Sequence, residues 1–487
     1  MKKKANKTYT LKKTNKTNTK KKTRTRQSVK KKEAEAREFS FDPAIFDMLN
    51  PNAAGIDVGT EEMWVCVPAY RAVQNVRTFG AFSDDLYAIA DWLWECGITS
   101  VAMESTGVYW IPLYQVLEER GFGVCLTNAR HLKNVSGRPK TDNLDCQWIQ
   151  RLHSYGFLNA SFRPRDEICR IRSIQRHRAN LIRQAGQHIQ HMQKALHQMN
   201  VLLPKVVSDI MGVTGKAIIE KILDGQHDPV KLAKLRNVHI KSPEEEIAKA
   251  LKGDYREEHL FVLRQAYKSY HFVHEQLREC DRVLERLMQA LDKQVDATQT
   301  PVPPRTKTPQ PKAKNAHKFA SDVRTLLYEC FGTDVTAIPG INESNGLSLF
   351  SELGSDLSAW ETDKRFSSWL GVSPNVQSSA GKVRSSQTRK MANRVAGVFR
   401  MAARSVSRSK SALGAFYRRM KARLGAPKAM TATAHKIAVV FYHMVRERTT
   451  YREVGETEYT QQQEQRMLKR LKQQAKRLGY TLRPQEA

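Results

Sequence analysis

Four acidic residues occupy positions from which their carboxylates could share a metal ion. Asp57 stands in one largely apolar segment, and Glu104 closes another. Asp142 and Asp145 are three residues apart and would share one face of a helix. Carboxylates that converge repel one another unless a cation lies between them, and Mg²⁺ binds oxygen ligands. The set predicts a metal-dependent phosphoryl-transfer site that uses Mg²⁺ or Mn²⁺.

Hydrophobic periodicity predicts the elements that would position these acids. Strands are expected at residues 54–58, 63–67, 76–82, 100–104 and 124–128, and helices at 84–96, 109–120 and 141–154. The acids then stand at element ends, where open α/β sheets place their chemistry. Three strands followed by alternating helices and strands resemble the ribonuclease-H-like fold. That fold keeps its metal ligands on the first strand, the fourth strand and a late helix. Any one of these acids alone is more often a solvated charge or a helix cap.

A serine far downstream is a second candidate for chemistry. Ser379 lies in the Ser/Gly-rich segment 371–384, which is expected to be a loop, and Ser378 beside it is an alternative hydroxyl. The basic residues around and after this serine are Lys382, Arg384, Arg389, Lys390 and Arg394. A hydroxyl nucleophile and phosphate-binding groups could meet here. On chemistry alone the segment is more often a basic nucleic-acid-binding loop, because no His-Asp pair is evident nearby.

Further phosphate contacts are expected at Arg138 and Lys140, just before the paired aspartates, and at Gly340. The Ile-Pro-Gly-Ile turn at Gly340, followed by a helix, resembles a helix-hairpin-helix motif, whose turn amides hold a DNA phosphate.

The charge of the chain points to a polyanionic partner. Lys and Arg total 81 against 49 for Asp and Glu, which gives a net charge of +32. This excess favours nucleic acid. No apolar run approaches the roughly 20 residues that cross a membrane, and no signal peptide is evident. We therefore expect a cytoplasmic, nucleoid-associated protein that does not bind a membrane. The 7 cysteines are scattered, so neither a zinc ribbon nor a disulfide framework is indicated.

Composition and periodicity divide the chain into six regions. We expect a disordered basic tail at 1–50, an α/β domain at 51–165, a helical hairpin or coiled coil with an inserted tip at 166–296, a Pro-rich linker at 297–319, a mainly helical domain at 320–450, and a basic helix and tail at 451–487. The fold class is therefore α/β followed by α.

Several motifs taken together resemble a known family. They are GIDVG around Asp57, AMESTGVYW around Glu104, KTDNLDCQWI around Asp142 and Asp145, the IPGI turn, and SAGK after Ser378 followed by TRK. Their order is similar to that in the DEDD transposases of the insertion sequence 110 family (with its 1111, 116 and 902 relatives), which are related to Piv-type DNA invertases.

The resemblance implies a site-specific DNA recombinase with an N-terminal RuvC-like domain and a C-terminal transposase domain. Asp57, Glu104, Asp142 and Asp145 would be the metal-binding acids, and Ser379 the nucleophile. The partners it implies are DNA of the element ends and target, a structured bridge-type guide RNA, and further copies of the chain in a dimer or tetramer.

Three alternatives remain open at this point. A RuvC-like, structure-selective nuclease would use the acids with water and leave Ser379 dispensable. An actin-fold ATPase or sugar kinase would share the GIDVGT phosphate loop, but the sequence lacks the later acidic loop and the Gly-rich adenosine site of those enzymes. A non-enzymatic nucleic-acid-binding protein would account for the charge, although it gives no reason for four acids at one sheet edge.

Overall fold

The computed structural model describes residues 48–105, 107–128, 142–305, 319, 322–389 and 391–481. The chain splits into two compact units, Met1–Ser161 and Phe162–Ala487. Apart from residues 48–50, the predicted basic tail lies outside the described residues, as does most of the predicted linker.

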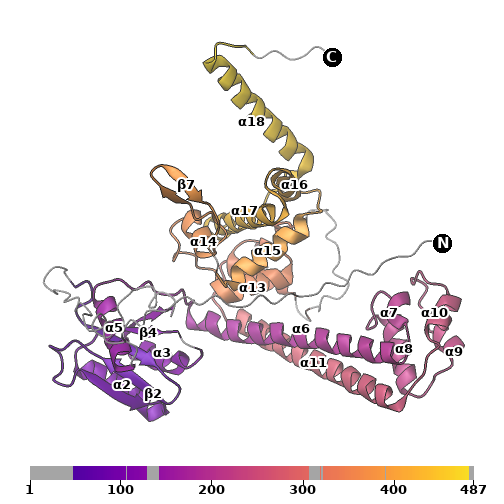
Figure 1. Cartoon of the computed structure of the whole chain (residues 1–487), viewed down its shortest axis with the longest axis horizontal. Coiled ribbons are helices and arrows are strands. Elements are labelled where there is room, and N and C mark those ends of the chain that lie inside the picture. The colour runs from indigo at the N-terminus through magenta and orange to yellow at the C-terminus, as the bar shows by residue number, and fades with distance from the viewer. Residues whose placement is uncertain are drawn as a thin grey trace, which may run out of the picture. The chain divides into compact units, whose positions relative to one another are not determined.

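The first unit is built on a mixed five-stranded sheet (Figure 1). Its strands are β1 (Ala53–Val58), β2 (Glu62–Cys66), β3 (Val76–Gly80), β4 (Ser100–Glu104) and β5 (Gly123–Thr127), in the order β3-β2-β1-β4-β5. The first three strands pair antiparallel, whereas β4 lies parallel to both β1 and β5. This mixed sheet fits the predicted ribonuclease-H-like fold, and each strand begins and ends within two residues of its prediction.

Three described helices cover the sheet: α2 (Ser83–Glu95), α3 (Trp110–Glu119) and α5 (Asp142–Ser154). Strand alternation explains the two faces. Ala54, Ile56 and Val58 of β1 pack in the large core with α2 and α3. Ala102 of β4 packs instead with Ile149 and Leu152 of α5. The sheet is therefore buried on both faces, and α5 alone covers the second one among the described helices.

The second unit begins with a long helical hairpin, as predicted. Helices α6 (Asp166–Gln198) and α11 (Glu257–Gln289) pack against each other, and the tip between them carries α7 (Leu203–Val206), α8 (Val213–Leu223), α9 (Pro229–Ala233) and α10 (Glu244–Ala250) around a core of their own. Midway along the hairpin, Arg178 Nε donates to Asp281 Oδ1 at 2.6 Å in a fully buried ion pair. Burying such a pair is tolerated because each charge neutralises the other.

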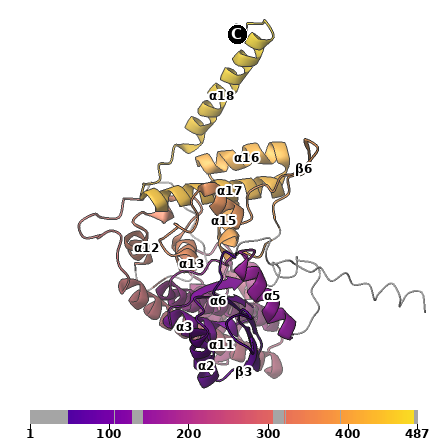
Figure 2. The same cartoon turned by 90° about the vertical axis from the view of Figure 1, so that its left-hand side faces the viewer.

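A helical bundle follows the hairpin and shares its core. The bundle comprises α12 (Val323–Phe331), the 3-10 helix η2 (Val335–Ala337), α13 (Glu343–Leu353), α14 (Asp363–Trp369), α15 (Arg394–Val406), α16 (Ala412–Leu424) and α17 (Ala426–Glu447). Ile168 of α6 and Leu284 of α11 belong to the same buried cluster as Phe366 and Phe441. Figure 2 shows α16, α17 and α15 as successive layers of the bundle, with β6 at one end.

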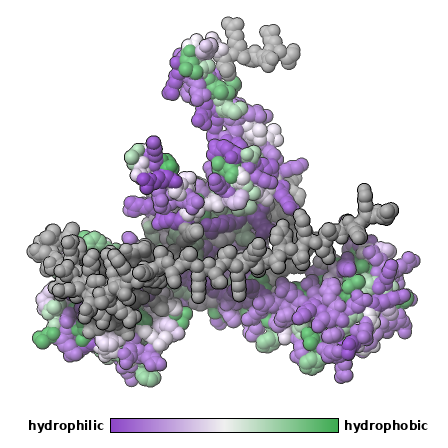
Figure 3. All heavy atoms as spheres, viewed as in Figure 1, coloured by the Kyte–Doolittle hydropathy of each residue, from purple (hydrophilic) through white to green (hydrophobic). Residues whose placement is uncertain are grey.

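Two exposed elements extend from this bundle. Strands β6 (Gln377–Ser379) and β7 (Lys382–Ser385) form a two-stranded hairpin, and α18 (Gly455–Arg477) packs on α16 while burying none of its own residues. The second element is the basic exposed helix that the sequence predicts. The visible described surface is mostly hydrophilic, with small, separate hydrophobic spots (Figure 3). None of the described helices is both long and apolar enough to cross a membrane.

Candidate active site and serine hairpin

Two of the predicted acids lie on the same face of adjacent parallel strands. Ile56 of β1 is in register with Met103 of β4, so continuing the register by one residue places Asp57 beside Glu104. Both residues are half-buried. Because side chains alternate along a strand, Asp57 shares the face of Gly55, and Glu104 shares that of Ala102. This is the face that α5 covers.

A glycine allows α5 to lie directly on the sheet. A Cβ added at Gly55 would lie 2.2 Å from the backbone N of Gln150 and 2.4 Å from the carbonyl O of Cys146. Gln150 Nε2 also donates to the Ala53 carbonyl at 3.3 Å. The later turns of α5 therefore lie over the beginning of β1, and its first turn points to the end where Asp57 stands.

The remaining two acids are in that first turn. Asp142 begins α5, and Asp145 is half-buried beside the fully buried Cys146. Asp145 precedes the buried Ile149 by four residues, so it lies on the face of α5 that packs on the sheet. The side chain of Asp142 lies outside the described residues, as do Arg138 and Lys140. Among the described side chains, no group of three or more His, Cys, Asp or Glu is gathered closely enough to hold a metal ion.

Buried polar side chains also lie between α5 and the sheet, toward the end of the helix away from the acids. Ser100 Oγ and His153 Nε2 are hydrogen-bonded at 2.7 Å, and burial lowers the pKa of His153. A hydrogen bond with Cys146 and burial raise the pKa of Cys66, so this thiol stays protonated. The contacts of Cys66, Ser100 and His153, together with those of Gly55 and Gln150, position α5. The sequence patterns did not predict a role for any of them. The only sequence signal is a glycine inside an apolar strand, which is typical of close backbone approach.

Ser379 lies on a β-hairpin, so the prediction of a loop at 371–384 was wrong for this part. The strands turn through Ala380 and Gly381, whose φ values are +48° and +75°, and two positive φ values are typical of a two-residue type I′ turn. Ser379 pairs directly with Lys382 across the turn. Ser378 pairs with Val383, and alternation places it on the opposite face. The sequence contains no Asn-Gly or Asp-Gly turn signal here, which explains the miss.

The base of the hairpin is anchored to the bundle. Arg389 Nη2 donates to the carbonyl of Ser368 at 3.3 Å and also to its hydroxyl. Asn393, at the other end of this connection, caps α15 by accepting from Ala396 N at 3.0 Å. Lys382, Arg384 and Arg394 are exposed, and Lys390 lies outside the described residues. The hairpin thus presents Ser379 and several cations on a fixed base.

Gly340 has a structural role in the same unit. Its φ is +90°, and a Cβ there would lie 2.5 Å from the carbonyl O of Ala402 in α15. The predicted helix after the turn is present as α13, but a single turn of 3-10 helix, η2, precedes Gly340. Phosphate binding at this turn stays a prediction.

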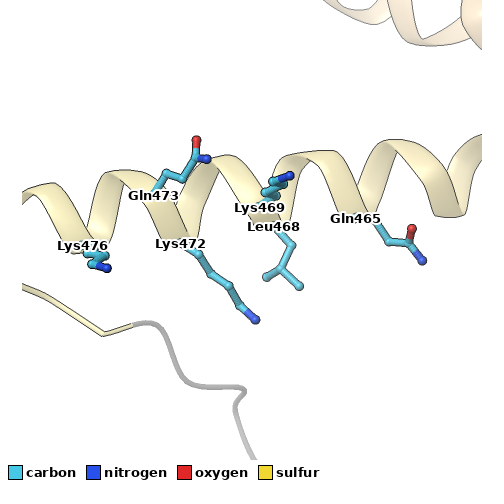
Figure 4. A pocket seen from close by; sticks show the side chains of 6 residues that line it. All are labelled: Gln465, Leu468, Lys469, Lys472, Gln473 and Lys476. Carbon is cyan, nitrogen blue, oxygen red and sulfur yellow. The ribbon is translucent and has the colours of Figure 1, made fainter.

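A shallow pocket elsewhere has no part in this chemistry. It is lined by Gln465, Leu468, Lys469, Lys472, Gln473 and Lys476 (Figure 4). All of these residues come from one side of α18, so no second element faces them and no nucleophile or acid is present.

Two protein-family models match the chain, one beginning in the first unit and one in the helical bundle of the second. Residues 54–201 match a family model described as a transposase of the DEDD, IS110 type, and residues 333–418 match the model described as "Transposase IS116/IS110/IS902 family". No curated protein matches the chain. The two matches, one beginning in each unit of the fold, assign the chain to the transposases, an enzyme class that cuts and rejoins DNA. Within that class, the chain belongs to the IS110 family of transposases.

Proposed function

We propose that the chain recombines the DNA of an insertion sequence by using Ser379 as nucleophile and the acids Asp57, Glu104, Asp142 and Asp145 as metal ligands. The observation that carries the proposal is the placement of Ser379 opposite Lys382 on an exposed hairpin of an IS110-family transposase. The exposed cations Lys382 and Arg384 suit the phosphate of a scissile bond.

The acids fit a hard divalent cation because their donors are all carboxylate oxygens and because β1 and β4 end, and α5 begins, near these residues. Mg²⁺ or Mn²⁺ held there would neutralise charge that develops on the phosphoryl oxygens. Asp142 would complete the set, since the described side chains alone do not form a group of three.

In the cutting step, Ser379 Oγ forms a bond to phosphorus while the bond from phosphorus to the leaving deoxyribose oxygen breaks. The serine proton passes to solvent, and the leaving oxygen takes up a proton. Rejoining reverses these changes with a new DNA end. Because no carboxylate or histidine is present in the hairpin, activation of the serine has to come from the acids, in the same or another copy of the chain.

The proposal includes the partners that the family resemblance implies. DNA of the element ends and target would be the substrate, a structured guide RNA would select the sites, and the active species would be a dimer or tetramer. The net charge of +32 supports binding to one or more polyanions.

The test is covalent trapping. A reaction with labelled element-end DNA, stopped under denaturing conditions, should leave DNA attached to the protein. Ser379→Ala should abolish this adduct and retain DNA binding, whereas Ser378→Ala, the matched control on the opposite face, should still form it. If Ser379→Ala recombines DNA, a nuclease that uses water becomes the better explanation.

A further inference from the structure

The helix that follows the serine hairpin has one buried face and one basic face. Val395, Phe399, Ala402 and Val406 of α15 are fully buried, and α15 packs against α13 and α17. The opposite face and the turn just after it carry Arg394, Arg404 and Arg408, which are exposed, with Arg400 half-buried at the flank.

No carboxylate among the described residues forms an ion pair with these arginines. The sequence contains no Asp or Glu between Asp363 and Glu447. None of the four arginines forms an ion pair with another residue in the described ranges, whereas Arg176 of α6 lies 2.7 Å from Glu352. Arg400 and Arg404 of α15 are four residues apart, a spacing at which like charges destabilise a helix, and Arg408 follows in the turn just beyond the helix. The arrangement calls for an external polyanion.

A glycine on the same face gives an independent observation. Gly397 lies in the interior of α15, where glycine is less stable than alanine. A Cβ added at Gly397 would meet no heavy atom within 4 Å, and its φ is not positive. Neither packing nor backbone conformation therefore requires glycine. The open space leaves room for close approach of a ligand's backbone, and the exposed arginines on either side distinguish Gly397 from Gly186 of α6, where a Cβ also meets nothing within 4 Å.

We propose that this surface, the α15 arginine face (Arg394, Gly397, Arg400, Arg404 and Arg408), binds the sugar-phosphate backbone of duplex DNA. At about 1.5 Å per residue, the helical part of the face from Arg394 to Arg404 is about 15 Å long, which corresponds to about four phosphates of one strand at about 3.4 Å of DNA axis each, and Arg408 lies just beyond it. Gly397 lets the strand lie against the helix, and the arginines on either side contact its phosphates.

The choice of DNA rests on the proposed function. The hairpin that holds Ser379 leads directly into α15 within one compact unit, and its base is fixed to the bundle by Arg389. A duplex held on the α15 arginine face would therefore be the DNA that reaches the serine.

The test compares two glycine variants in full-length protein. Gly186 of α6 is the matched control, since a Cβ there also meets nothing within 4 Å. Both Gly397→Ala and Gly186→Ala should melt at or above the temperature of the parent. Only Gly397→Ala should raise the dissociation constant for duplex DNA, by about tenfold, as measured by fluorescence anisotropy. Unchanged duplex affinity of Gly397→Ala, or a lower melting temperature, would overturn the role given to this glycine.

The arginines are tested by the salt dependence of the same binding. Arg400→Gln, Arg404→Gln and Arg408→Gln should each reduce the slope of log K against log salt by about 1. Lys216 of α8, in the tip of the helical hairpin, is the control, because its ammonium lies 3.8 Å from the carboxylate of Glu220. Lys216→Gln should leave the slope unchanged. Unchanged slopes for all three arginine variants would refute the assignment. If the variants instead weaken binding of RNA of the same length and spare DNA, the occupant is RNA and the proposal is wrong.

Binding is measured in the Ser379→Ala background, so that no result depends on cleavage. A covalent adduct that persists in Ser379→Ala would refute the proposed nucleophile while leaving the α15 arginine face to be judged by its own binding data.

Discussion

The acidic sheet edge of the first unit and the serine hairpin of the second present reactive groups in opposite ways. Asp57 and Glu104 stand at the ends of strands that are buried on both faces, and Asp142 and Asp145 stand in the first turn of α5, which lies on the backbone of Gly55. Ser379 and Lys382 stand on a short exposed hairpin that only its base holds. The comparison shows where precision is needed. Carboxylates that repel one another have to be held in place by the packing around them. A single hydroxyl that contacts a large ligand can instead lie on an exposed hairpin.

The largest effect should come from removing a carboxylate. Asp57→Asn should lower the rate of strand cleavage by about a thousandfold, because it removes a charge from the set that balances the metal. Duplex binding should be retained or tightened, since a negative charge is lost. Asp91→Asn is the control, because Asp91 is exposed and its carboxylate lies 2.8 Å from the guanidinium of Arg120. This ion pair joins α2 to the end of α3 and does not involve any of the four acids. Normal cleavage by Asp57→Asn would remove the acids from the mechanism.

The next largest effect should come from placing a methyl group between α5 and the sheet. Gly55→Ala should destabilise the first unit by about 3 kcal/mol, since the new Cβ overlaps backbone atoms that cannot move aside. Gly123→Ala on β5 should be tolerated, because its Cβ would lie 3.7 Å from the nearest atom, Thr99 O. The two variants can be compared by thermal unfolding followed by circular dichroism. Equal melting temperatures would show that α5 is not held as described.

A smaller effect is expected at the exposed hairpin. Lys382→Gln should leave the melting temperature unchanged, because the side chain is exposed. It should reduce the slope of log K against log salt by about 1 for duplex binding, through loss of one phosphate contact. A large loss of stability instead would show that the hairpin, like the sheet edge, depends on its side chains for structure.

The smallest effect concerns pH and His153. Burial lowers the pKa of this histidine below its ordinary value of 6.5, so the unfolded chain binds the proton more readily than the folded one. The stability that results is present above the ordinary value and is lost as pH falls through the folded pKa. His153→Gln should flatten the decline of melting temperature between about pH 7 and pH 5. An unchanged decline would assign the acid sensitivity to other groups.

The sequence by itself determined the first unit's strands, the long hairpin and the exposed α18, because alternation of apolar residues and helical periodicity are strong over these lengths. It also identified the acids and the serine by type and order.

Only the tertiary structure decided the local geometry around these residues. The overlap of α5 with Gly55, the hydrogen bond between Ser100 and His153, and the open space at Gly397 depend on how residues that are distant in sequence pack together. The serine hairpin likewise forms from residues of low strand propensity, and Ala380 takes a φ of +48° that alanine rarely adopts. Such features arise from long-range packing and backbone conformation, which local sequence patterns do not encode.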